Sequence, residues 1–360
     1  MDRLERLAEQ DSAQASNKQQ LFDKTFTRWL IGLGLMVLVV GLLARFVEGP
    51  INTRFQIFAT IFMGIFVEAV PFLLAGSLVS GLLEVFVGKR MLERLIPRHP
   101  VPAAFVGSLL GFVFPVCECG VVPVTRRLYQ KGMPLTVGVS FLLAAPVINP
   151  IVLLSTVAVF GWGPVVYGRF AFTIIIATII GLVFTVARPR DVLIPESVTM
   201  PDLQLQAAAG MANLPTMPQA SSSTAGRLWD AVGIAGDDFI DMVRFLILGC
   251  MLAATMQTFL PQAVLLQLGE GPVVSVVVMM VLAFILSVCS TVDAFLALSF
   301  AGTFTVGSIL AFLTFGPMVD TKSALMFLGV FRRRTVAYLL GLSFMLMLVI
   351  GVFINLFVNW

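Results

Sequence analysis

Two cysteines flank an acid in the segment Cys117-Glu118-Cys119, which Pro115 and Pro123 bracket. Proline breaks helices, so we expect a turned or extended backbone here rather than a continuous helix. Side chains two residues apart face apart on a helix, whereas a turned or extended segment can bring them to one side. Two thiolates on one side would bind a soft metal ion or metalloid, because sulfur ligands select soft acceptors. The competing interpretation is that these cysteines are simply small buried residues.

A second segment with a cysteine and an acid lies in the C-terminal half, where Cys289 precedes Asp293 by four residues. Together with Cys117 and Cys119, Cys289 would supply the three sulfurs that suit a trivalent thiophilic centre. Charged side chains within apolar stretches usually face a cavity or a partner. Glu118 and Asp293 are therefore candidates for solute binding or proton exchange, and a structural hydrogen-bonding role is the alternative.

Two proline-containing breaks each end in a polar residue, Pro146-Val-Ile-Asn149 in one and Pro317-Met-Val-Asp320 in the other. Prolines free backbone carbonyls, which can then bind a solute or a side chain. Asn149 and Asp320 are therefore candidate solute ligands. Lys322 either pairs with Asp320 or extends towards the cytoplasmic interface.

Glu68 and Asp241 are matched acids in the helices that lead into the two cysteine segments, and an interfacial position is the alternative for both. Cys250, in an otherwise apolar helix, is expected to be a packing residue. We predict no catalytic residue, no metal site and no cofactor. The predicted solute-binding residues are Cys117, Glu118, Cys119, Asn149, Cys289, Asp293 and Asp320, and the predicted proton-coupling residues are Glu68, Glu118, Asp241 and Asp293.

The composition indicates a membrane protein, because 58% of the 360 residues are hydrophobic and 12% are charged, against about 25% charged in soluble domains. One histidine is too few for bis-histidine haem or histidine–carboxylate iron sites. The scattered Lys and Arg form no nucleic-acid patch. The expected partners are a small-molecule or metalloid solute and the lipid bilayer, with a homo-oligomer left open. Several apolar stretches reach the roughly 18 residues that span a bilayer: Trp29–Val47, Ile57–Val87, Val165–Ala187, Val273–Phe304 and Tyr338–Val358.

The two halves of the chain match each other at an offset of about 172 residues. Polar, Gly, Pro and Cys residues are among the matched positions, which favours a true repeat over chance similarity between apolar helices. The matched segments are Glu68–Gly76 with Asp241–Gly249, Val116-Cys117 with Val288-Cys289, and Pro146–Asn149 with Pro317–Asp320.

Loop charges predict the topology, because cytoplasmic loops carry excess Lys and Arg. We expect an all-α polytopic membrane protein of two inverted repeats, each with a re-entrant helical hairpin. The hairpins would turn near Cys117–Gly120 and Cys289–Thr291, giving about seven spans plus two hairpins; eight to nine full spans is the alternative. The predicted parts are a cytoplasmic N-terminal arm at 1–27, a first transmembrane helix and loop at 28–54, repeat 1 at 55–187, a flexible cytoplasmic linker at 188–227 and repeat 2 at 228–360.

The segment Pro115–Pro123, followed by Arg126-Arg127 and then Leu142–Pro150, resembles the predicted-permease family that includes the YraQ-like proteins and the ArsP exporters of trivalent organoarsenicals. The resemblance covers most of the membrane part of the chain and implies a multi-pass permease of the bacterial inner membrane. For the arsenical exporters it implies cysteine-dependent efflux of methylated or aromatic arsenic(III) compounds. That role carries over only to Cys117 and Cys119.

We therefore expect a secondary transporter rather than an enzyme, exporting a thiophilic solute such as a trivalent organoarsenical. A soft metal ion or a small sulfur compound is the next candidate. The absence of a phosphate-binding loop argues against ATP hydrolysis by this chain. One alternative is a membrane thiol oxidoreductase, although such enzymes usually carry a Cys-x-x-Cys pair and a relay pair. Another is a structural or sensor subunit.

Overall fold

The computed structural model describes residues 50–88, 91, 96–97, 99–114, 116–194, 224–259 and 271–357. The predicted N-terminal arm, nearly all of the first predicted transmembrane part and linker residues 195–223 lie outside the described residues. The chain divides into two compact units, Met1–Ala59 and Thr60–Trp360. The described residues of the first unit begin helix α2, and the second unit contains the other described helices.

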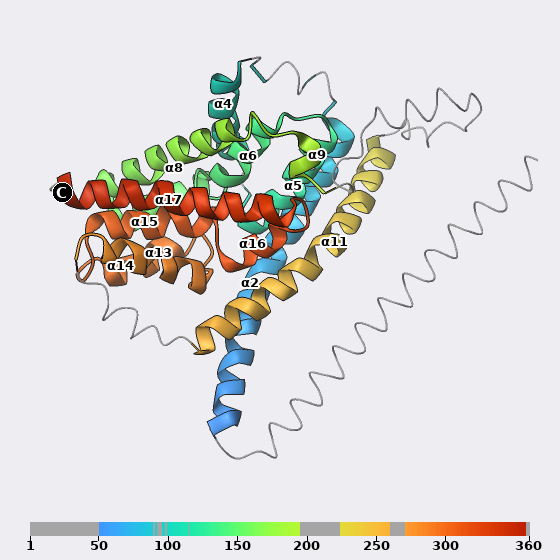
Figure 1. Cartoon of the computed structure of the whole chain (residues 1–360). Helices are drawn as coiled ribbons and strands as arrows, with labels where there is room; N and C mark the ends of the chain where they lie inside the picture. The colour runs from blue at the N-terminus through green and yellow to red at the C-terminus, as the bar shows by residue number, and fades with distance from the viewer. Residues whose placement is uncertain are drawn as a thin grey trace, which may run out of the picture. The chain divides into compact units, whose positions relative to one another are not determined.

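Regular structure in the described part is helical, apart from an isolated antiparallel bridge between Leu193 and Phe331 (Figure 1). The helices are α2 (Pro50–Phe86), α4 (Pro100–Val113), α5 (Glu118–Gln130), α6 (Leu135–Ala144), α7 (Pro150–Phe160), α8 (Pro164–Val183), α9 (Pro189–Val192), α11 (Thr224–Phe259), α13 (Val274–Leu286), α14 (Asp293–Phe300), α15 (Val306–Met318), α16 (Thr321–Phe327) and α17 (Arg333–Phe357).

Four helices within the described residues are long and apolar enough to cross a bilayer. Four shorter apolar helices accompany them, namely Pro100–Val113, Leu135–Ala144, Pro150–Phe160 and Val274–Leu286. The predicted all-helical membrane class is thereby confirmed, whereas the inverted repeat and the hairpins remain predictions. The long candidate spans are Thr53–Phe86, Pro164–Val183, Gly226–Phe259 and Arg333–Phe357.

Two sets of three helices pack together in the described part of the chain (Figure 1). Helix α4 packs against α6 and α8, and α13 packs against α15 and α17. Helix α8 also contacts α15 and α17, so the two sets share one hydrophobic core. The sets occupy corresponding positions in the two halves of the sequence.

Both proline-containing breaks interrupt helices where the sequence predicts. Helix α6 ends at Ala144 and α7 begins at Pro150, with Asn149 as its N-cap. The Asn149 side chain accepts a hydrogen bond from the Ile151 amide at 2.9 Å. Capping satisfies backbone amides that a helix start leaves without partners.

The second of these breaks lies between α15, which ends at Met318, and α16, which begins at Thr321. Asp320 and Ser323 form a capping box, in which each side chain bonds the backbone amide of the other residue. The capping box stabilises a short helix within an apolar surrounding and fixes where its first residues point.

The cysteine segments also lie at interruptions. Helix α4 ends at Val113 and α5 begins at Glu118, so Glu118–Gly120 form the first turn of a helix instead of the expected turn. Helix α13 ends at Leu286, and the break that follows contains the predicted turning point at Cys289–Thr291. Ser287 caps this end in a left-handed conformation with φ 48°.

Candidate functional site

Three of the helix interruptions meet at the ammonium group of Lys322. Its Nζ donates to Glu118 Oε1 at 3.2 Å and to the Ser287 carbonyl at 2.7 Å. Asp320 Oδ2 lies 3.6 Å from the same nitrogen. Lys322, Glu118 and Asp320 are each 2% exposed. We call these three residues the acid–lysine–acid triad, and it joins the two halves of the sequence.

Glu118 is held from both halves of the chain. It is the first residue of α5, and its Oε2 accepts a hydrogen bond from Ser290 Oγ at 3.5 Å. Ser290 follows Cys289 as Glu118 follows Cys117, so this contact joins two positions that the sequence repeat matches. The first turn of a helix also favours a carboxylate, because unpaired backbone amides leave partial positive charge there.

Asp320 has one satisfied carboxylate oxygen and one unsatisfied one. Its Oδ1 accepts from the Ser323 amide at 2.6 Å as part of the capping box. Its Oδ2 is buried and has no hydrogen-bond partner among the described residues. The Lys322 ammonium is the charge that faces this oxygen, at the 3.6 Å distance of a loose ion pair.

All four cysteines are buried and have free thiols. The Cys119 thiol interacts with that of Cys117, and Cys119 and Cys289 both interact electrostatically with Lys322. Cys250, expected only to pack, is also within electrostatic range of Lys322. Thiols of both cysteine segments therefore lie within electrostatic range of Lys322.

The described residues contain no group of three or more His, Cys, Asp or Glu side chains that could hold a metal ion. Cys117 and Cys119 form a pair, and Cys289 Sγ lies 3.4 Å from Thr291 Oγ1. A three-sulfur site would therefore require Cys289 to move towards the pair. Asn149 lies beside the first cysteine segment, where its amide nitrogen donates to the Val116 carbonyl at 3.4 Å.

Asp293 forms a second buried charge site with Arg169. The guanidinium donates from Nη2 to Asp293 Oδ2 at 2.6 Å and from Nη1 to Oδ1 at 3.1 Å. Arg169 Nη1 also donates to Thr156 Oγ1 at 2.8 Å. Arg169 is 0% exposed and links α8 to the first residue of α14. Arg169 was not among the predicted site residues, although a lone arginine within a predicted span is itself a signal of a functional or paired residue.

Comparison with known proteins identifies the family. The sequence pattern of the predicted permease family ArsP_1 matches residues 54–356. The chain belongs to this family of predicted permeases. The permease is 42% identical to the UPF0718 protein YcgR of Bacillus subtilis over 287 residues, which cover 78% of this chain and 91% of the relative.

A second relative is the putative two-component membrane permease complex subunit of Streptococcus mutans. The two sequences are 33% identical over 291 residues, which cover 80% of the permease and 92% of the relative. No solved structure matches the permease. The family confirms a multi-pass membrane protein that functions in transport.

The predicted proton carriers Glu68 and Asp241 stand apart from the triad. Asp241 has a side chain 39% exposed and pairs with Arg126 at 3.0 Å and, more loosely, with Arg244. Glu68 is partly buried in α2. Within the described part, no hydrogen bond or ion pair joins either acid to Lys322.

Matched glycines allow the two long helices of the permease to approach the site. A Cβ on Gly76 of α2 would overlap the backbone of Gly120, two residues after Glu118. A Cβ on Gly249 of α11 would approach the backbone of Lys322 to 2.8 Å. The sequence repeat matches Gly76 with Gly249. Both positions therefore need glycine, because small residues allow the backbones of membrane helices to pack closely.

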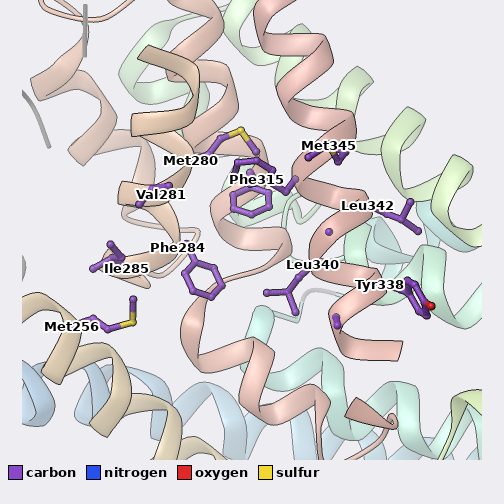
Figure 2. A pocket seen from close by; sticks show the side chains of 13 residues that line it. Met256, Met280, Val281, Phe284, Ile285, Phe315, Tyr338, Leu340, Leu342 and Met345 are labelled. Atoms are coloured by element: carbon purple, nitrogen blue, oxygen red, sulfur yellow. The ribbon is translucent and has the colours of Figure 1, made fainter. Parts of the chain in front are cut away.

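An apolar pocket of about 510 Å³ lies between α11, α13, α15 and α17 (Figure 2). Thr321, the neighbour of Lys322, donates to the Phe284 carbonyl at 2.8 Å and contacts Met256 Sδ at 3.9 Å. Phe284 and Met256 both line the pocket. The lining residues come from α11, α13, α15 and α17 and include Met280, Phe315, Tyr338 and Met345.

Proposed function

We propose that the permease is a secondary transporter of the bacterial inner membrane that exports a thiophilic small solute, with a trivalent organoarsenical as the leading candidate. The observation that carries this proposal is the meeting of three helix interruptions at the Lys322 ammonium. Irregular backbone at membrane depth is tolerated where protein shields it or where it lines a cavity. Secondary transporters commonly build their solute sites from such interrupted helices.

The thiols near Lys322 support the choice of solute. Cys117 and Cys119 would hold the arsenic(III) centre, and movement of Cys289 would add the third sulfur. The apolar pocket would accept the methyl or aromatic groups of the solute, because its walls carry aliphatic, aromatic and methionine side chains. Asn149 and Glu118 would supply polar contacts, and Asp293 would act through the buried pair with Arg169.

A growth test addresses this proposal directly. The permease is expressed in arsenic-sensitive bacteria that are exposed to arsenicals, antimonials, soft metal ions and sulfur oxyanions. We expect protection against the correct thiophile, and its loss in C117S and C119S, because serine is a hard oxygen ligand. The matched control C250S removes a buried thiol outside the two cysteine segments and should retain protection. Full protection by well-expressed C117S/C119S would contradict the ligand role.

The inverted topology is part of the same proposal. Matched packing in the two halves, α4 with α6 and α8 against α13 with α15 and α17, supports a repeat. With the N-terminus and linker in the cytoplasm, Ser222→Cys should be labelled from the cytoplasmic side and Trp162→Cys from the periplasmic side. The four native cysteines are buried, which keeps the background labelling low. Labelling of both positions from one side would exclude this topology.

A thiol oxidoreductase is the second candidate, because the Cys117 and Cys119 thiols interact with each other and are free. Thiol–disulfide exchange proceeds through a mixed disulfide with the substrate thiol. Trapping such a mixed disulfide on Cys117 or Cys119 of the full chain, with no solute-dependent protection in the growth test, would favour this function over transport of a thiophile.

A further inference from the structure

The acid–lysine–acid triad contains one more acid than base. Glu118 and Asp320 lie on either side of Lys322, at 3.2 Å and 3.6 Å from its Nζ. All three side chains are at most 3% exposed. If all three groups were ionised, the triad would carry a net charge of one negative unit in a buried site.

The neighbouring groups do not supply the missing positive charge. The Ser290 hydroxyl contacts Glu118, and the thiols of Cys119, Cys250 and Cys289 interact with Lys322 electrostatically. The Ser287 carbonyl is a further acceptor. These groups are all uncharged near neutral pH in their unperturbed forms.

The nearby Asp293 interacts with Glu118 electrostatically but is neutralised by its own bidentate partner, Arg169. That second site is balanced, with one acid and one base, and so it contributes no spare positive charge to the triad. Within the part of the chain that the structure describes, Lys322 is therefore the cation that both Glu118 and Asp320 share.

A buried charge without a compensating partner is unfavourable, and the group usually becomes neutral instead. The start of α5 offsets part of this cost for Glu118, since a helix N-terminus carries about half a positive charge. Asp320 Oδ1 already accepts a hydrogen bond from the Ser323 amide in the first turn of α16. The buried Oδ2 of Asp320 has no hydrogen-bond partner among the described residues. This oxygen is the least satisfied of the triad, because its one charged contact is the 3.6 Å ion pair with Lys322.

We propose that the triad holds one exchangeable proton, shared between Glu118 and Asp320 across Lys322, and that the permease exchanges this proton for its solute. The exchange rests on the proposed transport function, whereas occupancy of the triad by a proton does not. A proton fits better than a metal cation for two reasons. The described residues contain no group of three or more His, Cys, Asp or Glu side chains that could hold a metal ion, and the Lys322 ammonium would repel a cation.

Infrared spectroscopy of the full chain in lipid nanodiscs tests the proposal without any solute, through the carbonyl-stretch band of protonated carboxyl groups near neutral pH. Each variant is compared with the unmodified protein, so protonated carboxyls elsewhere in the chain cancel. E118Q and D320N each leave one acid beside one base, and each should lose the band of one protonated carboxyl. The control D237N removes an exposed acid outside the triad and should not change the band.

Charge-compensating variants sharpen the test. K322M leaves two buried acids without a base, so the band that the triad contributes should increase about twofold. The double variant E118Q/K322M leaves one acid without a base and should restore that contribution. Bands that do not change in E118Q and D320N, which are nearly isosteric with the native residues, would overturn proton occupancy, even if K322M fails to fold.

The proton can be present while the proposed exporter function is wrong, and the growth test with C117S and C119S separates the two. If the cysteine variants lose protection but the infrared bands of E118Q and D320N are unchanged, transport of a thiophile is supported. The proposal that the triad holds a proton is then wrong. If the infrared bands change as expected but the permease protects against none of the tested compounds, the triad holds a proton. The proposed solute is then wrong.

Discussion

The two buried charge sites of the permease differ in composition and in geometry. Arg169 and Asp293 form a one-to-one pair with two parallel hydrogen bonds, and Thr156 supports the guanidinium. Lys322 instead divides its charge between two acids and donates to one backbone carbonyl. The first site satisfies both carboxylate oxygens of Asp293, whereas the second leaves one oxygen of Asp320 without a hydrogen bond.

This difference indicates distinct roles for the two sites. An arginine fork fixes the direction of its partner, whereas a lysine ammonium is a point charge on a flexible stem that can move between acceptors. The Arg169–Asp293 pair therefore suits a fixed link between α8 and α14. The triad suits a site whose charge changes when a proton or a solute arrives.

Removing one acid from each site should give the largest difference in stability between the two sites. D293N leaves the fully buried Arg169 without its counter-charge, and breaking a buried pair in this way costs about 3–5 kcal/mol of stability. D320N leaves the balanced pair of Glu118 and Lys322, so we expect a cost within about 1 kcal/mol, mainly from the altered α16 cap. Thermal unfolding of the purified proteins in the same detergent measures both.

Equal destabilisation by D293N and D320N would remove the distinction between a balanced and an unbalanced site. The variant R169M/D293N provides the matched control, because it removes both charges of the pair. It should recover part of the stability lost in D293N, since neutral partners of similar size avoid an uncompensated buried charge.

A smaller contrast should come from the hydroxyl groups that support each site. T156V removes the acceptor of the 2.8 Å hydrogen bond from Arg169 and leaves a buried donor group less satisfied, at a cost of about 1–3 kcal/mol. S290A removes a 3.5 Å hydrogen bond to Glu118, at the limit of such contacts, and should cost less than about 0.5 kcal/mol. The same unfolding assay ranks the two variants, and a larger effect of S290A would show that Glu118 depends on Ser290 more than the geometry indicates.

The sequence predicts much of the helical framework because prolines, apolar stretches and caps act locally. Asn149 and Asp320 cap helices at the predicted breaks, and Gly76 and Gly249 lie at corresponding close approaches. The predicted interruption is present before Glu118, but the turn expected at Cys117–Gly120 is only partly so, because α5 already begins at Glu118. Pro123 is the sixth residue of α5 and lies inside the helix, where it has no amide hydrogen to donate but does not end the helix.

The electrostatic partners could not be predicted from local pattern. Glu118 and Lys322 are far apart in the sequence, and so are Arg169 and Asp293, so only the tertiary packing of the helices brings them together. The sequence offered Asp320 or the cytoplasmic interface as partners for Lys322, and the structure adds Glu118 from the other half. Arg169 was not recognised in the sequence, because the surrounding stretch is apolar enough to be a membrane span.

Ser287 caps the C-terminal end of α13 and also contacts Lys322 of the triad. It has a left-handed backbone, a conformation that costs a non-glycine residue about 1–2 kcal/mol. Two contacts oppose this cost, because the Ser287 carbonyl accepts from Lys322 and its hydroxyl accepts from the Thr321 amide at 3.1 Å. The residue that ends α13 is thus held by the same ammonium that pairs with Glu118, so the position of the α13 end depends on where Lys322 lies.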